Sequence, residues 1–119
     1  MLIAMTIVSV AVVKILVDGP RPGVFFPSLV TRLEAGDPYG FPSGHVALIA
    51  SVCYVLWDRE NDMGKFILLT ITVWVALARC AAGLHFPLDV VAGGLVAVIV
   101  CALCKRLMSK WFRVEVAGT

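Results

Sequence analysis

Four long apolar segments, separated by short polar connections, constrain this chain more than any other feature of its sequence. They run from about residue 1 to 17, 43 to 57, 66 to 82 and 87 to 104. Hydrophobic residues make up 61% of the chain, whereas soluble domains contain about 45–50%. With 119 residues, the chain is long enough for one domain. The sequence therefore predicts an all-α fold: a transmembrane helical bundle of four spans, forming a single membrane-embedded domain over residues 1–119.

The connections and the ends of the chain complete this outline. Residues 1–17 lack a basic leading region and a clear cleavage site, so we expect a retained membrane helix and not a signal peptide. Residues 18–41 form a loop rich in Gly and Pro, in which residues 27–35 allow a short interfacial helix. Residues 58–65 are predicted to form a polar turn, and residues 105–119 a basic tail that is frayed at its end.

Basic residues are distributed unequally between the two sides of the predicted bundle. Four spans place both termini on one side, and six basic residues fall there: Arg59, Lys65, Lys105, Arg106, Lys110 and Arg113. The positive-inside rule therefore predicts an integral, multi-pass membrane protein whose termini are cytoplasmic. No basic stripe with interleaved aromatic residues is present, so we expect the bilayer and not nucleic acid as a partner.

A turning pentapeptide, Phe41-Pro42-Ser43-Gly44-His45, leads directly into the second apolar segment. Pro, Ser and Gly in this order are typical of a turn that opens a helix, with Ser43 as an N-cap whose hydroxyl can accept from the first amides. Gly44 allows a ligand to approach the backbone, and free N–H groups at a helix start bind anions. His45 can move a proton near neutral pH. By itself, the stretch fits a capped helix with an interfacial histidine equally well.

The predicted topology gathers unusual residues on the extracytoplasmic face. Lys14 and Arg79 lie near the ends of two outward-running helices, Arg21 lies in the loop, and His85 and Asp89 flank the start of the last helix. Ionisable residues at membrane depth are costly and are functional candidates. Three cations and two positive helix ends would repel one another without an anion, so this face is predicted to bind phosphate. The alternative is a set of unrelated snorkelling charges.

The spacing of the second histidine suggests a chemistry for this site. His85 and Asp89 are four residues apart, which would bring the carboxylate under the imidazole and leave the other ring nitrogen free to attack. His45 could then protonate the leaving oxygen and later activate water. This is phosphoryl transfer without a metal. Two histidines and one aspartate could also bind zinc, but the three nearby cations would oppose a dication.

Three motifs are similar to those of a known family: Lys14-x6-Arg21-Pro22, Pro42-Ser43-Gly44-His45 and Arg79-x5-His85-x3-Asp89. Together they resemble the signature of the type 2 phosphatidic acid phosphatase superfamily, over about residues 14–94. The resemblance implies hydrolysis of a lipid phosphate or diphosphate without metal or other cofactor. It implies that His85 is the nucleophile and forms a phosphohistidine, that Asp89 orients it, and that His45 is the acid and base. The residues implied to hold the phosphate are Lys14, Arg21, Ser43, Gly44 and Arg79.

Two departures from the family pattern leave alternatives open. The third motif usually begins with Ser, where this chain has Ala78. Membrane members usually have six spans, with the first motif after the third, so we expect the catalytic part of such a protein without its first helices. A non-catalytic or truncated membrane subunit that keeps a phosphate-binding face is the alternative. The resemblance does not choose among phosphatidate, phosphatidylglycerol phosphate and polyprenyl diphosphate. Soluble vanadium-dependent haloperoxidases share the site, but the apolar spans argue against that branch.

The last predicted span carries a patch of small residues, Gly93, Gly94 and Ala97. Small residues allow close helix contact, either within the bundle or between copies in a homo-oligomer. Cys101 and Cys104 lie in the same span and are expected to pack as small side chains, because no second cysteine pair or soluble redox context accompanies them.

Overall fold

The computed structural model describes residues 1–26 and 39–117, with side chains as far as Trp111. Within these residues the chain is helical, and its one β feature is an isolated bridge between Pro20 and Tyr39. The all-α prediction is therefore confirmed for the described part. The interfacial helix expected within residues 27–35 lies outside the described residues.

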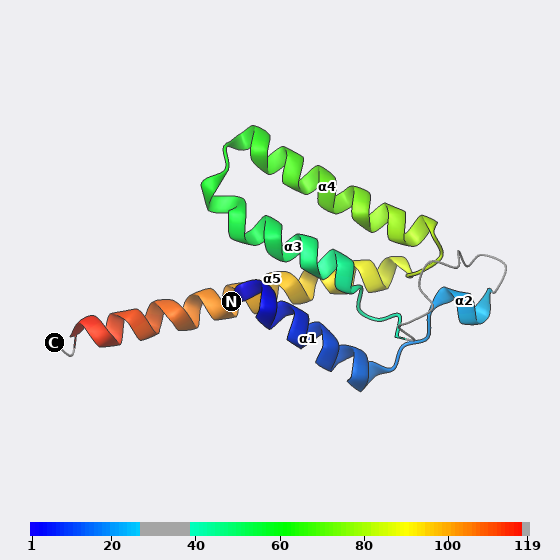
Figure 1. Ribbon diagram of the computed structural model, residues 1–119, viewed down its shortest axis with the longest axis horizontal. Helices are drawn as coiled ribbons and strands as arrows, with labels where there is room; N and C mark the ends of the chain where they lie inside the picture. The colour runs from blue at the N-terminus through cyan, green and yellow to red at the C-terminus, as the bar shows by residue number, and fades with distance from the viewer. Residues whose placement is uncertain (27–38, 118–119) are drawn as a thin grey trace.

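The elements follow one another in this order: α1 (Leu2–Val17), α2 (Pro22–Phe25), α3 (Gly44–Leu56), the 3-10 turn η2 (Trp57–Arg59), α4 (Asp62–Ala81) and α5 (Pro87–Ala117). The four long helices coincide with the four predicted apolar segments (Figure 1). Long apolar runs without internal proline predict helices well, which explains the agreement.

Two helices extend beyond the predicted apolar segments. Helix α4 begins four residues earlier than the apolar run, at Asp62, because the Asn61 side chain caps it: Asn61 Oδ1 accepts from Gly64 N at 2.9 Å. Helix α5 continues through the expected basic tail to Ala117. Residues 105–117 contain neither glycine nor proline, so nothing in the sequence ends the helix at residue 104.

Helix α3 lies at the centre of the bundle and packs against α1, α4 and α5. The whole is flat, with extents of 63 × 36 × 19 Å, and the C-terminal part of α5 projects beyond the other helices (Figure 1). The C-terminal ends of α1 and α4 lie at the same end of the bundle as the N-terminal ends of α3 and α5. The polar residues at these four helix ends are therefore brought together.

Small side chains make up the contact between α1, α3 and α5. Ala47 and Ala97 are buried in one cluster with Val10, and Thr6 Oγ1 lies 3.6 Å from Cys101 Sγ. A methyl group at Gly93 would overlap the carbonyl oxygen of Ser43. Gly93 and Ala97 thus serve contacts within the chain, which is one of the two meanings that the small-residue patch allows, whereas Gly94 faces open space.

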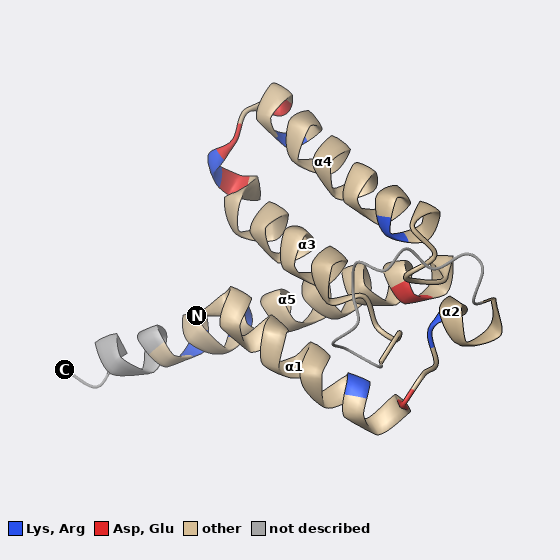
Figure 2. Cartoon of the chain, turned by 45° about the vertical axis from the view of Figure 1, so that its right-hand side comes forward, with Lys and Arg blue, Asp and Glu red and all other residues tan. Residues whose placement is uncertain are grey.

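Large apolar side chains point outward instead. Helix α4 has no buried residue, and its exposed side chains include Phe66 and Trp74. Two helices, Asp62–Ala81 and Pro87–Trp111, are long and apolar enough to cross a membrane, and α1 is a shorter apolar helix. The described charges gather at the two ends of the bundle (Figure 2). Small residues therefore lie inside the bundle and large apolar residues outside it. In a soluble helical protein, large apolar side chains are packed inside instead.

Candidate active site

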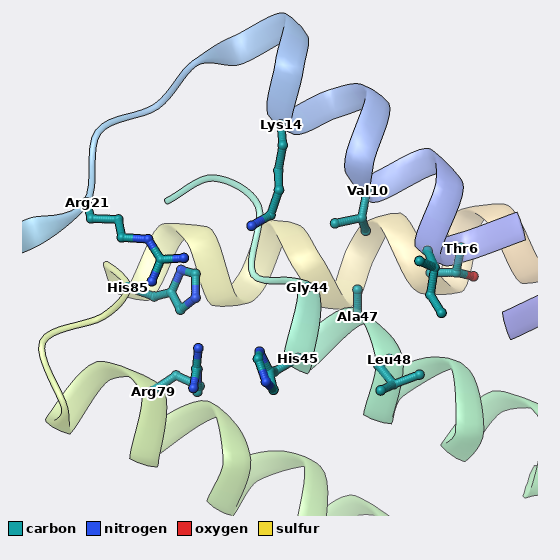
Figure 3. A pocket seen from close by; sticks show the side chains of 11 residues that line it. Thr6, Val10, Lys14, Arg21, Gly44, His45, Ala47, Leu48, Arg79 and His85 are labelled. Carbon is teal, nitrogen blue, oxygen red and sulfur yellow. The ribbon is translucent and has the colours of Figure 1, made fainter. Parts of the chain in front are cut away.

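A cavity of about 500 Å³ lies at the end of the bundle where the four helix ends meet. It is lined by Thr6, Ile7, Val10, Lys14, Arg21, Gly44, His45, Ala47, Leu48, Arg79 and His85. Six of the eight predicted site residues are among them: Lys14, Arg21, Gly44, His45, Arg79 and His85. The charged and histidine side chains occupy one half of the cavity, and the apolar side chains the other (Figure 3).

Three cationic side chains reach the cavity from three different elements. Lys14 lies in the last turn of α1, Arg79 in the last turn of α4, and Arg21 directly precedes α2. Lys14 Nζ donates to the carbonyl oxygen of Tyr39 at 3.2 Å. Figure 3 shows both arginine side chains beside His85. Together with the N-terminus of α3 at Gly44, this half of the cavity strongly favours an anion.

The two histidines differ in exposure and in what holds them. His45 stands on the first turn of α3 and is exposed. His85 lies in the connection between α4 and α5 and is 3% exposed. Its Nδ1 is 2.7 Å from the carbonyl oxygen of Gly40. A carbonyl can only accept, so Nδ1 carries the proton and Nε2 keeps the lone pair.

The surroundings of His85 also favour its neutral form. Burial is the largest cause that lowers the pKa of His85, and the positive charges of Arg21 and Arg79 lower it further. The hydrogen bond to Gly40 and the carboxylate of Asp89 act in the opposite direction, but the net shift is downward. A neutral imidazole with a free Nε2 is the form that a nucleophile requires.

Asp89 lies close to His85, though not as its hydrogen-bond partner. Asp89 Oδ2 is 3.7 Å from His85 Nδ1, which is too long for a hydrogen bond. The same oxygen accepts from Phe86 N at 2.7 Å, which caps the start of α5. Among the side chains of residues 1–26 and 39–111, no three from His, Cys, Asp or Glu gather closely enough to hold a metal ion.

Ser43 occupies the N-cap position of α3, as the sequence predicts, but its hydroxyl does not cap the helix. This part of the prediction was wrong. Ser43 is fully buried against α5, where its backbone N donates to the carbonyl oxygen of Asp89 at 2.9 Å. Its Oγ has no hydrogen-bond partner, and the residue does not line the cavity. The absence of a side chain at Gly93 allows this close approach.

Gly40 is the residue that sequence reasoning missed. Its amide donates to the carbonyl oxygen of Gly19 at 2.8 Å, beside the bridge between Pro20 and Tyr39. A methyl group on Gly40 would lie 3.1 Å from the carbonyl oxygen of Pro20 and 3.2 Å from Cα of Arg21. A side chain at residue 40 would therefore be crowded where these two segments meet. In a loop with several glycines, no local signal distinguishes Gly40 from the others.

Two known proteins are similar to part of this chain. The bacitracin transport permease protein BcrC of Bacillus licheniformis is 29% identical over 79 residues, which cover 66% of this chain and 38% of that protein. Sphingosine-1-phosphate phosphatase 2 of Mus musculus is 30% identical over 101 residues, or 77% of this chain and 28% of that protein. The chain thus spans 38% of the length of the first relative and 28% of the length of the second.

A solved structure and a family model extend the comparison to most of the chain. The crystal structure of Aquifex aeolicus LpxE matches with a TM-score of 0.78 and 29% sequence identity, covering 88% of this chain and 63% of that one. The family model of the PAP2 superfamily matches residues 1–113. These residues include all three motifs that surround the cavity. The chain belongs to the PAP2 superfamily.

Proposed function

We propose that this chain is the catalytic part of a membrane lipid phosphatase that hydrolyses a phosphate or diphosphate monoester through a phosphohistidine. The observation that carries the proposal is the cavity itself. It brings a neutral, oriented His85 and an exposed His45 together with three cations. Membership of the PAP2 superfamily and the relative named as a sphingosine-1-phosphate phosphatase support the same reaction class.

In the first step, the Nε2 lone pair of His85 attacks phosphorus, and the bond from phosphorus to the lipid oxygen breaks. His45 gives its proton to that oxygen, so the lipid leaves as an alcohol or, from a diphosphate, as a monophosphate. Lys14, Arg21 and Arg79 neutralise the phosphate oxygens, and Gly44 N–H adds a donor at the start of α3. These groups supply the positive charge that a metal supplies in other phosphoryl-transfer sites.

In the second step, His45 takes a proton from water, and the water oxygen attacks phosphorus. The bond from phosphorus to Nε2 breaks, and inorganic phosphate leaves. His85 returns to its neutral form with the proton still on Nδ1, because the Gly40 carbonyl accepts from that atom in both steps. Asp89, at 3.7 Å, stabilises the positive imidazole ring while the phosphate is attached.

We further propose that α1, α3, α4 and α5 all span the bilayer, with cytoplasmic termini and an extracytoplasmic cavity. Three observations support this. Helix α4 buries no residue within the chain, which would be costly in water. The charged residues that the structure describes gather at the two ends of the bundle. Lysine and arginine are more frequent at the end that carries the termini.

The test is phosphate release by the purified chain in lipid nanodiscs. Substrates are phosphatidate, phosphatidylglycerol phosphate, sphingosine-1-phosphate and polyprenyl diphosphate. We expect turnover that survives a strong chelator and is blocked by vanadate, which mimics five-coordinate phosphorus. Activity that disappears in chelator and returns with zinc or magnesium would contradict the phosphohistidine route. Binding of vanadate without turnover of any substrate would favour the non-catalytic alternative.

A further inference from the structure

A second cavity lies between α3, α4 and α5 and shares no lining residue with the active-site cavity. Its volume is about 550 Å³, within the range of about 300–1,000 Å³ that is typical of small-molecule sites. Helix α3 supplies its floor with Ala50 and Cys53, both buried. Leu69 of α4 and Leu95 of α5 form its rims and are exposed. The cavity is therefore a groove that opens between α4 and α5, and we call it the α4–α5 groove.

The middle of the α4–α5 groove is apolar and open. A methyl group on Gly94, which lines the groove, would meet no heavy atom within 4 Å. Thr72 also lines it, but its Oγ1 donates to the carbonyl oxygen of Leu68 at 2.8 Å, within α4. An apolar ligand can therefore fill this part without depriving the Thr72 hydroxyl of its hydrogen bond.

The α3 side of the groove ends at two aromatic side chains, Tyr54 and Trp57, and a lysine lies over each ring. Lys65 Nζ is 5.7 Å from the centre of the Trp57 ring, and Lys105 Nζ is 6.0 Å from that of Tyr54. The connection between α3 and α4 lies at the end of the bundle opposite α2 (Figure 1). Tryptophan, tyrosine and lysine are typical of the region where a membrane protein meets the headgroups. The groove therefore leads from the apolar middle of the bundle to one polar surface of the bilayer.

The two lysines lie on the same helix faces as the residues that line the groove. Lys65 is four residues before Leu69 in α4, and Lys105 is seven residues after Val98 in α5. Residues at these spacings share a face of a helix, so each lysine stands one or two turns beyond the lining residues. The apolar groove and the two cations are thus parts of one continuous surface.

Both lysines keep donors for a ligand. Lys105 Nζ donates to Asp58 Oδ2 at 2.6 Å, and Lys65 Nζ lies 4.0 Å from Asp62 Oδ1. All four side chains are partly or fully exposed, and exposed ion pairs are weak. An ammonium group has three donors, so each lysine can also bind a phosphate oxygen.

We propose that the α4–α5 groove binds one phospholipid from the leaflet on the side of the chain termini. Its phosphate lies at Lys65 and Lys105, and part of one acyl chain lies between α4 and α5. A charged headgroup and an apolar chain in one molecule complement the two parts of the groove. The inference rests on the proposal that α3, α4 and α5 span the bilayer, and it is independent of the catalytic mechanism.

A second copy of the chain complements the groove less well. Copies in one bilayer have the same orientation, so a two-fold pair through this face would bring both sets of lysines to the same depth. Like charges at short distance repel each other. A phospholipid brings a negative charge to the same place.

The position of α4 gives the bound lipid a consequence that can be measured. Helix α4 has no buried residue, and its last turn carries Arg79. An acyl chain in the groove would contact α4 and α5 together and hold α4 against the bundle. A ligand that binds the folded state alone raises the unfolding temperature.

The test measures binding of dioleoyl phosphatidylglycerol to the full chain in detergent. This lipid is a phosphodiester, so hydrolysis of phosphate monoesters does not consume it. We expect native mass spectrometry to show one retained lipid per chain, and the unfolding temperature to rise with lipid concentration. Val98→Trp fills the groove and should abolish both effects. Ile99→Trp is the matched control, because Ile99 is 55% exposed but does not line the groove.

The headgroup contact is tested separately. The double variant Lys65→Gln, Lys105→Gln should raise the apparent Kd for phosphatidylglycerol about tenfold or more. The double variant Arg106→Gln, Lys110→Gln removes the same charge from residues that do not line the groove, and it should leave Kd unchanged. Dioleoyl glycerol, which has no phosphate, should not shift the unfolding temperature.

Three results would overturn the proposal. They are equal lipid binding by Val98→Trp and Ile99→Trp, equal binding of dioleoyl glycerol and phosphatidylglycerol, and a dimer without retained lipid that Val98→Trp dissociates. The last would assign the groove to a second copy. The outcome is also separate from catalysis. A chain that releases no phosphate but retains a lipid that Val98→Trp removes would support the groove while the proposed function fails. Phosphate release by a chain that retains no lipid would overturn the groove alone.

Discussion

The Nδ1 atom of His85 lies 2.7 Å from the carbonyl oxygen of Gly40, a residue 45 positions earlier in the chain. Asp89, the expected partner from the i, i+4 spacing, is 3.7 Å away and caps α5 instead. A backbone carbonyl cannot be removed by mutation, but its position can be changed through the residue that carries it. We therefore expect Gly40 to position His85, and the contacts around it suggest the first prediction.

Gly40→Ala should lower kcat with little change in KM. The new methyl group would meet Pro20 O and Arg21 Cα at 3.1 and 3.2 Å, which moves the carbonyl away from His85. Loss of a buried hydrogen bond costs about 1–3 kcal/mol, so we expect a decrease of about 5- to 150-fold. Gly94→Ala, where nothing lies within 4 Å, is the control and should retain full activity. Equal kcat for the two variants would show that the Gly40 contact does not position His85.

Replacement of either histidine should separate their two roles. His85→Gln removes the nucleophile and should abolish turnover of every substrate. His45→Ala removes the general acid, which contributes about 10²–10⁴-fold where the leaving oxygen needs a proton. It should therefore fail on a lipid monophosphate but still be phosphorylated by nitrophenyl phosphate, whose leaving group departs nearly unaided. For His45→Ala, we expect a burst of nitrophenol release followed by slow turnover. A phosphohistidine at residue 85 should be detected in this variant after denaturation without acid. A burst from His85→Gln together with no reaction from His45→Ala would reverse the assignment.

The lowered pKa of His85 predicts how activity changes in mild acid. His85 must be neutral to attack, and burial keeps its pKa below the ordinary histidine value. The acid limb of kcat/KM should therefore lie below about pH 6.5. Asp89→Asn removes a charge that raises this pKa, so the acid limb should move to lower pH, while the amide oxygen can still cap Phe86. A limb that moves upward in Asp89→Asn would show that another group controls it.

The same shift predicts the pH dependence of stability. Because the folded state holds His85 neutral, the unfolded state binds more protons just below the ordinary histidine pKa, and the free energy of unfolding rises with pH there. Stabilisation by this group is complete above about pH 6.5 and is lost as pH falls through the lower, folded-state pKa. His85→Gln should flatten this part of the curve, measured by denaturant unfolding in detergent micelles. An unchanged slope would mean that His85 is not held neutral.

The adjacent glycines of α5 should differ in their tolerance of alanine. At Gly93, a methyl group overlaps the Ser43 carbonyl oxygen, so Gly93→Ala should push the start of α3 away from α5. Overpacking typically costs about 1–3 kcal/mol, and the displaced His45 should lower activity as well. Gly94→Ala meets open space and should change neither property. Comparison of unfolding midpoints and kcat/KM for the two variants tests this, and equal behaviour would contradict the packing described here.

The proposed orientation can be tested with single cysteines, in a background in which the four native cysteines are replaced by alanine. Val24, in α2, is 67% exposed at the cavity end, and Glu60 is exposed between η2 and α4. In intact cells, an impermeant thiol reagent should label Val24→Cys, whereas Glu60→Cys should be labelled only after lysis. The reverse pattern would invert the topology while leaving the site chemistry unchanged.

The sequence by itself determined the four long helices and most of the residues around the cavity. Apolar runs of this length leave few alternatives to helix, and polar residues at their ends meet when the helices alternate in direction. Lys14, Arg21, Gly44, His45, Arg79 and His85 were all predicted as site residues, and all line one cavity. Residues 105–117 contain no helix-breaking residue and continue α5 to Ala117. Because several of them are basic, we predicted a tail there instead of a helix.

Only the tertiary structure decided the partner of His85, the burial of Ser43 and which residues of α1 and α3 line the cavity. Each depends on residues that are far apart in sequence: Gly40 with His85, Ser43 with Gly93, and Thr6 and Val10 with Ala47. Helical spacing predicts contacts within one element, such as His85 with Asp89, because the backbone geometry is local and fixed. Contacts between elements depend on how closely two backbones approach, and here glycines and small side chains set that distance.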